Sequence, residues 1–443
     1  MLKIPLPELQ TFQRAALERT VETCAVGLVL PAGAKGGVER HVVRQLEEVP
    51  EGAYLSRSAI EAILRPEYCI DIANRARAAG GGVLLAHTHV GRNRLEGFSA
   101  VDDVGERDLA KYFDRRVAGA PHFAAVVTGQ AAYARRLGQA GLVPAIGVGR
   151  TLALPPLSAC ELQPQYDRQI RAFGAQGQQA IQRLTIAIVG LGGTGSVVAQ
   201  QLAHLGALDF VLIDPDRLET TNLNRLVGAR LEDVGSLKVD VATRHITSIN
   251  PEARCTAIEG DILDRPVAAV LATVDFVFGC TDSMGSRAVL NQFAHQYLVP
   301  CIDMGVAIGT QGGKVQYVTG RTQMLSPGLP CLVCTDKLDA EQIRRDLMTE
   351  RQRKRDPYIV GAAVPQPAVI SLNSTMASAA ITMFLAAVVG TPSDARMVIY
   401  DGTRGSLRPA AMPPRPHCIA CSYEGALARG SSWLLPERAA DLD

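Results

Sequence analysis

Short apolar runs alternate with amphipathic stretches along the first third of the chain. Four of the runs have the length and composition of buried strands: CAVGLVL, GVLLAHTH, FAAVVTG and PAIGVG, which begin at positions 24, 82, 123 and 144. The stretch 58–80 carries apolar residues at helical spacing and predicts a helix. We therefore expect residues 1–150 to form a small mixed α/β domain.

A different pattern follows a proline-bearing, weakly patterned stretch at 151–163, which predicts a linker. A buried strand over 183–190 leads into a glycine turn and a helix, and a second strand over 207–216 ends in acids. This order predicts a β-α-β unit with parallel, helix-covered strands. Further strand candidates are VDFVFGC, PCIDMGVAI, GGKVQYVTG and ARMVIYDG. We expect a second domain over 164–443 that ends in a loosely held tail after Cys421.

Composition and charge narrow the class of protein. The 443 residues are 47% hydrophobic and 20% charged, which predicts two or three globular domains. The net charge of +1 favours neither nucleic acid nor an acidic membrane surface as a partner. The uncharged stretch 360–393 is smoothly apolar only over 376–389, so it predicts a buried helix rather than a membrane span. The first 20 residues lack a signal-peptide core, which predicts a cytoplasmic protein with reduced cysteines.

Two histidines end the run GVLLAHTH. Side chains at i and i+2 of a strand share a face, so His87 and His89 could bind one zinc ion, with Asp102 as third ligand and water as fourth. Glu22, just before an apolar strand, is the candidate general base for that water, and Ser99 would lie beside it. The structural alternative is that Ser99 caps a helix with Asp102 at its third position. The two roles are compatible.

The order Glu, His-x-His, Ser-x-x-Asp resembles the motif of the JAB/JAMM metalloproteases, which remove ubiquitin and ubiquitin-like proteins. The resemblance implies a JAB/MPN-like α/β domain in which His87, His89 and Asp102 bind a catalytic zinc. It also implies that Glu22 is the base and that Ser99 stabilises the oxyanion. The loop after His89 is two residues longer than in the usual motif.

A glycine-rich turn, VGLGGTGS, contains Gly190, Gly192, Gly193 and Gly195 between a strand and a helix, and Asp214 ends the next strand. Glycines permit a tight turn and bring phosphates close to the helix N-terminus, while the acid can bind ribose hydroxyls. This pattern alone fits a nicotinamide-dependent oxidoreductase equally well.

The polar residues that follow the turn favour ATP instead. Asn222, Asn224, Arg225 and Lys238 come after the ribose acid. Fixed cations at such positions stabilise the charge that develops when the α-phosphate of ATP is attacked. Asp282, in FGCTDS at the end of another strand, is suited to bind Mg²⁺.

The motifs YDRQ, GLGGTGS, DPD, NLNR, G-x-x-K and C-T-D, with two Cys-x-x-Cys pairs, come in one order over 164–421. They resemble the ThiF/MoeB group, bacterial relatives of ubiquitin-activating enzymes. The resemblance implies a Rossmann-like, doubly wound domain that adenylates a ubiquitin-like or sulfur-carrier protein and works as a homodimer.

The resemblance also implies roles for single residues. Asp214 would bind ribose with Asp216 beside it, and Asp282 would bind Mg²⁺. Arg168 of YDRQ would reach the nucleotide bound by the other subunit. The phosphates would be held by Asn222, Arg225 and Lys238.

The cysteines favour structural zinc over covalent catalysis. The two Cys-x-x-Cys pairs predict one tetrahedral zinc site formed by Cys331, Cys334, Cys418 and Cys421, with a redox role as the less favoured alternative. Many ThiF/MoeB relatives carry a thioester-forming cysteine after the first pair, but a basic helix over 344–355 stands there in this chain. Cys280 and Cys301 end strands and are expected to be buried. A separate conjugating enzyme or sulfur donor would then take the adenylated product.

The sequence thus predicts a bifunctional enzyme, an ATP-dependent adenylyltransferase joined to a zinc peptidase that processes or deconjugates the modifier. Two alternatives remain. The N-terminal domain could only bind the modifier, or the chain could be a nicotinamide-dependent oxidoreductase, which the NLNR motif and Lys238 disfavour.

Overall fold

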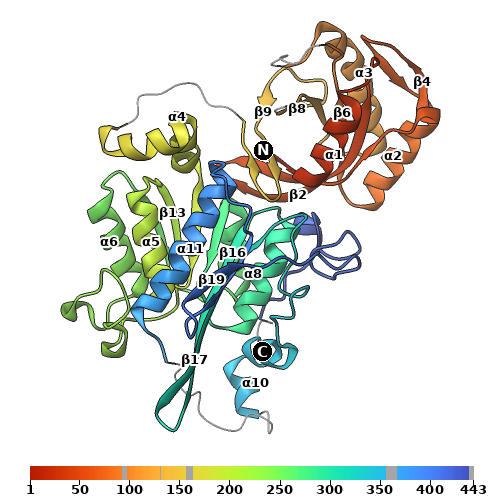
Figure 1. Ribbon diagram of the computed structural model, residues 1–443. Coiled ribbons are helices and arrows are strands. Elements are labelled where there is room, and N and C mark those ends of the chain that lie inside the picture. The colour runs from red at the N-terminus through yellow and green to blue at the C-terminus, as the bar shows by residue number, and fades with distance from the viewer. Residues whose placement is uncertain (92–96, 130, 156–162, 356–366, 439–443) are drawn as a thin grey trace. The chain divides into compact units, whose positions relative to one another are not determined.

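The computed structural model describes residues 1–91, 97–129, 131–155, 163–355 and 367–438 (Figure 1). The chain forms two compact units. The first consists of Met1–Pro156, Gln296–Leu298 and Cys421–Trp433, and the second consists of Leu157–His295, Val299–Ala420 and Leu434–Asp443. The expected linker at 151–163 falls mainly on residues 156–162, which lie outside the described residues.

A mixed sheet with the strand order β11-β10-β1-β3-β2-β6-β7-β8-β9 forms the centre of the first unit. Its strands are β1 (Leu2–Pro5), β2 (Cys24–Lys35), β3 (Val38–Glu48), β6 (Gly82–His87), β7 (Phe123–Val127), β8 (Ala132–Arg136), β9 (Leu142–Val143), β10 (Ala145–Val148) and β11 (Leu152–Ala153). Helix α1 (Leu6–Ala16) packs on one face, and α2 (Pro66–Ala78) and α3 (Ala100–Arg116) pack on the other. Figure 1 shows these helices around the sheet.

Alternation along β6 decides which side chains reach α3. Leu84 belongs to the hydrophobic cluster that contains Phe12 of α1, whereas its neighbour Val83 belongs to the cluster that contains Phe113 of α3. Successive side chains of a strand point to opposite faces, so His87 leaves β6 on the same face as Val83. The last residue of β6 therefore faces the helix that carries Asp102.

The helix expected over 58–80 is only partly correct. Residues of its first half form β5 (Ala62–Leu64), which pairs with β4 (Tyr54–Arg57), and α2 begins at Pro66. The residue before a proline is disfavoured in the helical region, and Arg65 is extended with φ −63° and ψ 139°. Proline at the first helical position fixes where the helix starts.

The loosely held tail expected after Cys421 is wrong for the part that the structure describes. The guanidinium of Arg44 donates hydrogen bonds to the carbonyls of Tyr423 and Leu427. The Tyr423 hydroxyl donates to the Glu8 carboxylate. Buried alanine and leucine side chains over 426–428 supply the apolar surface that holds this segment in the first unit.

A second sheet, with the order β14-β13-β12-β15-β16-β17-β18-β19, forms the second unit. Its strands are β12 (Thr185–Val189), β13 (Asp209–Ile213), β14 (Arg254–Ile258), β15 (Phe276–Gly279), β16 (Cys301–Gln311), β17 (Lys314–Leu325), β18 (Met397–Asp401) and β19 (Ser406–Pro409). The first five in spatial order are parallel, and the others join antiparallel. The expected parallel sheet is therefore confirmed, with an antiparallel extension.

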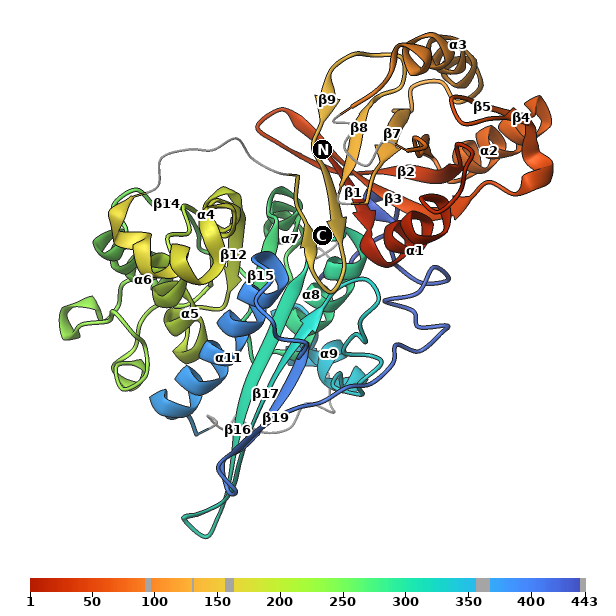
Figure 2. The same ribbon diagram turned by 45° about the horizontal axis from the view of Figure 1, so that its top comes forward.

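Helices cover both faces of the second sheet. The helices of this unit are α4 (Asp167–Arg183), α5 (Gly193–His204), α6 (Lys238–Ile249), α7 (Arg265–Val270), α8 (Met284–Gln296), α9 (Ala340–Asp346), α10 (Glu350–Arg355) and α11 (Ile370–Val388). Helix α5 contacts α6 and α11. Figure 2 shows α8 on the other side of the sheet from α5 and α11.

Helix α11 is, within the described ranges, the one helix long and apolar enough to cross a membrane. It contacts α5, β16 and β17, and its Phe384 is fully buried. The Phe384 ring lies 4.9 Å from that of Phe276, edge to face at 86°. These contacts are those of a core helix, as the sequence predicts.

Phe384→Ala should therefore destabilise the protein by about 3–5 kcal/mol, because it removes a fully buried ring and leaves a cavity. Thr382→Ala, at an exposed position of the same helix, should change stability by about 0.5 kcal/mol or less. Urea denaturation of the full chain measures both. Equal effects of the two substitutions would contradict a core position for α11.

Candidate functional site

A cavity of about 590 Å³ opens in the second unit, and most of the predicted nucleotide-binding residues line it. The predicted residues in its lining are Gly190, Gly192, Gly193, Asp214, Asp216, Asn222, Arg225, Lys238 and Asp282. They come from the turn after β12, the end of β13, the segment before α6, the first residue of α6 and the end of β15. In parallel sheets, ligands bind at the carboxyl ends of the strands, where these residues gather.

The glycine turn is as tight as the motif predicts. Gly190 has a φ of +88°, in the left-handed region that side chains disfavour. Gly195 does not appear in the cavity lining, but a Cβ there would lie 1.9 Å from the Gly190 carbonyl oxygen. Because Gly195 has no side chain, the start of α5 can pack against the turn. The role of Gly195 is therefore in packing.

The Asp214 carboxylate holds the turn from the neighbouring strand. One oxygen accepts a hydrogen bond from the Leu191 N–H at 2.6 Å, and the other accepts one from the Asp216 N–H at 2.9 Å. Burial raises the pKa of this carboxyl, while Lys238 and the two backbone donors oppose the rise. The acid is thus fixed at the floor of the cavity.

The cations approach from a different segment. Lys238, the first residue of α6, places its Nζ 2.6 Å from Asp216 and 3.8 Å from Asp214. The Arg225 guanidinium donates to the Thr221 carbonyl at 2.7 Å and to the Asn224 side chain at 3.2 Å. Asn224 is not among the described residues that line the cavity. Its side chain contacts the site indirectly, by accepting a hydrogen bond from Arg225.

Of two further predicted residues, Asp282 lines the cavity and Arg168 does not. Asp282 is exposed at the cavity, where a carboxylate could hold Mg²⁺. Arg168, in the first turn of α4, is exposed and does not line the cavity within the described part of this chain.

The two strand-end cysteines differ in exposure. Cys301 is fully buried, as expected, whereas Cys280 is half-buried and lines the cavity. Burial raises the pKa of both thiols above the usual value. A neutral thiol is a weak nucleophile, so neither residue has the properties of an activated cysteine.

The two Cys-x-x-Cys pairs come together. The sulfurs of Cys331, Cys334, Cys418 and Cys421 lie within 4.8 Å of one another, and all four residues are buried. The Cys331 sulfur is 3.7 Å from that of Cys334 and 3.5 Å from that of Cys418. These separations are too long for disulfides and are close to the roughly 3.8 Å between sulfurs that share one zinc ion. The cluster could hold zinc.

In the first unit the histidine motif converges on α3. The Nε2 atoms of His87 and His89 lie 3.0 Å apart, and they are 3.1 and 3.3 Å from the two oxygens of Asp102. Strand β6 ends at His87, so the expectation that both histidines lie on the strand is wrong for His89. The chain turns after His87 and still brings the His89 ring to the same point.

Ser99 and Asp102 form the capping box that the structural alternative predicts. The Ser99 N–H donates to the Asp102 carboxylate at 2.5 Å, and the Ser99 hydroxyl accepts from the Asp102 N–H at 3.3 Å. Burial alone would raise the pKa of Asp102, but hydrogen bonds from His87 and His89 bring it below the ordinary value. Capping therefore fixes Asp102 without removing it from the histidines.

A largely apolar cavity of about 680 Å³ adjoins this cluster. Glu22 is buried and lines it together with His87 and Asp102. The structure thus brings the candidate base from the start of β2 to the histidine motif, although 65 residues separate Glu22 from His87 in the sequence.

Sequence reasoning missed the cation that anchors α3. Arg135 of β8 is buried and forms ion pairs with Asp103 at 2.7 Å and Glu106 at 2.9 Å, both on α3. Its guanidinium lies 3.8 Å from the centre of the Phe98 ring, next to Ser99 in the chain. No local pattern marks Arg135, because its partners lie about thirty residues away.

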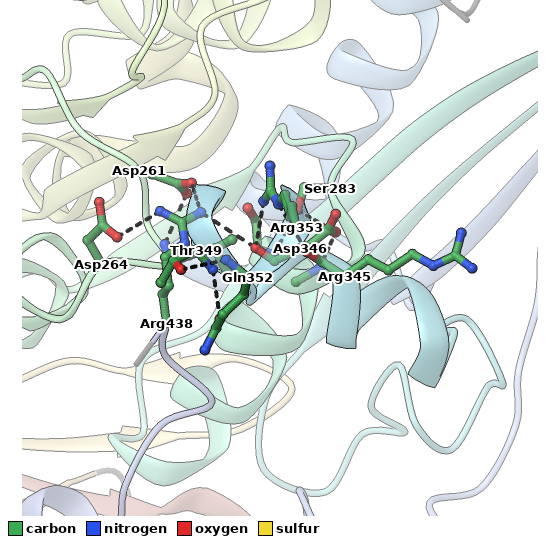
Figure 3. A network of polar contacts seen from close by, with 12 residues as sticks. Asp261, Asp264, Ser283, Arg345, Asp346, Thr349, Gln352, Arg353 and Arg438 are labelled. Carbon is green, nitrogen blue, oxygen red and sulfur yellow. Dashed lines mark hydrogen bonds and ion pairs between the residues drawn. The ribbon is translucent and has the colours of Figure 1, made fainter. Parts of the chain in front are cut away.

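The basic helix expected over 344–355 is also corrected. Two short helices occupy the region, because Thr349 and Gln352 form a capping box that starts α10 anew. Figure 3 shows Asp346, the last residue of α9, at the centre of the contacts there.

Comparisons with known proteins cover most of the second unit. The model of the ThiF family matches residues 166–420. The chain is 31% identical over 259 residues to the molybdopterin-synthase adenylyltransferase of Escherichia coli K12, covering 58% of this chain and 95% of that protein. It is 28% identical over 262 residues to the sulfur carrier protein adenylyltransferase of Thermus thermophilus, covering 59% and 91%.

The family match begins at residue 166, so it leaves the site formed by His87, His89 and Asp102 unassigned. It takes in the glycine turn, Asp214 and the cations around the cavity, and it covers more than half of the chain. The resemblance predicted from those motifs is confirmed, and the chain belongs to the ThiF family.

Proposed function

We propose that the second unit uses ATP to adenylate the C-terminal carboxylate of a sulfur-carrier or ubiquitin-like protein. The observation that carries the proposal is the cavity in which a glycine turn, a buried acid and two cations meet. The names of the two relatives, both adenylyltransferases, support the same chemistry.

The reaction forms one bond and breaks one. An oxygen of the modifier's terminal carboxylate attacks the α-phosphorus of ATP, and the bond from that phosphorus to the bridging oxygen of the β-phosphate breaks. Pyrophosphate leaves with the electron pair, and the modifier keeps AMP. Arg225 and Lys238, with Asn222, would bind the phosphates and stabilise the charge that develops there.

The remaining polar residues would bind and orient the nucleotide. Asp214 would accept hydrogen bonds from the ribose hydroxyls, with Asp216 beside it. Asp282 would hold Mg²⁺, which neutralises phosphate charge when bound. Arg168, which is exposed on α4, would serve the nucleotide of a second copy in a homodimer. We expect this enzyme to work in the cytoplasm.

Arg225→Ala or Lys238→Ala should slow the exchange of radiolabelled pyrophosphate into ATP by about 100-fold or more, because each cation stabilises developing charge. The assay contains a sulfur-carrier protein that ends in Gly-Gly. Arg217→Ala is the matched control, since Arg217 follows the acids in sequence but is absent from the cavity lining. Undiminished exchange in both cavity variants would refute the assignment.

We infer that the first unit is a zinc peptidase that processes or deconjugates the modifier. His87, His89 and Asp102 would bind the zinc, since their ligand atoms lie within 4.8 Å of one another. Bound zinc lowers the pKa of a water ligand. Glu22 would take the proton from that water, and Ser99 would stabilise the oxyanion. The adjacent apolar cavity is suited to an extended peptide.

The pairing of the two activities has a chemical reason. Adenylation requires a free terminal carboxylate, so a precursor with extra residues must first be trimmed. The second candidate function keeps the adenylation unit and gives the first unit only a binding role, which the half-buried capping pair Ser99–Asp102 would equally permit.

Metal analysis and cleavage together separate these two functions. The wild type should contain one zinc ion at the histidine site and one at the four cysteines. His87→Ala with His89→Ala should remove the first, and Cys331→Ser with Cys334→Ser should remove the second and destabilise the protein.

Glu22→Gln is the decisive matched variant. It should retain both zinc ions but cleave a sulfur-carrier precursor, extended beyond Gly-Gly, about 100-fold more slowly, because the base is lost. Zinc binding without cleavage in the wild type would favour the binding role. If the wild type contains no zinc ion that is lost on replacing the two histidines, the cluster is only a helix-capping motif.

A further inference from the structure

The C-terminal segment reaches the wall of the nucleotide cavity. The Arg438 backbone N–H donates to the Leu263 carbonyl at 2.8 Å. Its guanidinium donates to Asp261 at 2.8 Å and to Asp264 at 2.9 Å. All three partners belong to the loop between β14 and α7, and Figure 3 shows Arg438 between the two carboxylates. One arginine therefore bridges both acids of this loop.

That loop forms the part of the cavity where the base of a nucleotide would lie. Phosphates would rest on the glycine turn after β12, and ribose on Asp214 after β13. Strand β14 is the next strand in the same direction, and Gly260, Asp261 and Leu263 after it line the cavity. A nucleotide laid across the strand ends thus carries its base to the loop that Arg438 holds.

The same arginine contacts a second wall through Asp346. The Asp346 carbonyl accepts from Arg353 at 3.0 Å and more weakly from Arg438 at 3.5 Å. The Asp346 carboxylate accepts from the Ser283 hydroxyl and the Gly285 N–H, both at 2.9 Å. Ser283 is adjacent to Asp282, so the contacts in Figure 3 join the base end of the cavity to the proposed Mg²⁺ end.

Electrostatics explains why this position needs an arginine. Asp261 and Asp264 carry like charges three residues apart, and a single planar guanidinium can contact both while its charge offsets their repulsion. The Arg438 side chain is 21% exposed, and those of Asp261 and Asp264 are 30% and 44% exposed. Solvent screening weakens these ion pairs, but the contacts of the guanidinium still fix the positions of the two carboxylates.

We propose that Arg438 is a positioning residue of the adenylation site, which fixes the base-binding loop Gly260–Asp264 from the C-terminal end of the chain. This inference rests on the proposed function. It assigns a role to a segment outside the residues that the family model matches. Arg438 would act through the loop rather than by touching the reacting phosphates.

The test compares two ligands of the full-length protein. Isothermal titration calorimetry in the presence of Mg²⁺ measures the Kd for ATP and the Kd for inorganic pyrophosphate. Arg438→Met should raise the Kd for ATP about tenfold, because a misplaced loop loses the base contacts. It should leave the Kd for pyrophosphate within about twofold, because the turn, Arg225 and Lys238 are unchanged.

Matched variants keep the test decisive. Arg438→Lys keeps the charge but loses the two-pronged contact, so its Kd for ATP should be intermediate, and it carries the test if Arg438→Met does not fold. Arg254→Met is the control. Arg254 also makes two contacts with a carboxylate, that of Asp209, but at the opposite end of β14.

The outcomes are distinguishable. An unchanged Kd for ATP in Arg438→Met, or equal losses of ATP and pyrophosphate binding with a lowered Tm, would overturn the inference. Loss of ATP binding in Arg254→Met to the same degree would do so as well. If the wild type binds no ATP, the proposed function itself fails and the inference falls with it.

Discussion

The buried carboxylate of Asp214 joins the parts of the adenylation unit. It accepts hydrogen bonds from the turn after β12 and from Asp216 after β13. It also lies 3.8 Å from the Nζ of Lys238, the first residue of α6. A carboxylate inside a protein is costly unless donors and a cation surround it. These three backbone segments must therefore meet for the acid to be satisfied, and their meeting creates the nucleotide cavity.

In the first unit, a different set of charged residues surrounds the carboxylate of Asp102. Asp102 lies between two histidines, and the helix that carries it is held by the buried Arg135 through Asp103 and Glu106. In both units an acid of the candidate site is positioned by hydrogen bonds and ion pairs of neighbouring residues. Such supporting contacts set the geometry of a site as strictly as the residues that touch a ligand.

Local signals in the sequence predicted much of the site. The glycine turn, the strand-end acids and the Cys-x-x-Cys pairs are each defined by a few consecutive residues. Their positions can therefore be predicted from the sequence alone. Arg438 could not, because Asp261 lies 177 residues away and no periodicity marks the contact. The apolar spacing over 58–80 continues across Pro66 and therefore predicts a helix that is too long, whereas the local effect of proline on the preceding residue sets the true start.

In the proposed reaction, the region after the first cysteine pair is where a thioester-forming cysteine would be expected. Among its described residues, 335–355, the sequence has no cysteine. Asp346 of α9 contacts the start of α8 and the C-terminal segment, and Arg353 of α10 contacts α9. Cys280 and Cys301 have raised pKa values from burial. We therefore expect the activated modifier to leave as an acyl-adenylate or to pass to a thiol or amine on another protein.

Intact-mass spectrometry tests this account most directly. The purified chain is incubated with ATP, Mg²⁺ and a sulfur-carrier protein that ends in Gly-Gly, and both proteins are weighed without reducing agent. The account predicts that the carrier gains the mass of one AMP and that the mass of the chain is unchanged. A chain that gains the mass of the carrier, loses it on treatment with thiol, and no longer gains it after Cys280→Ala would contradict the account.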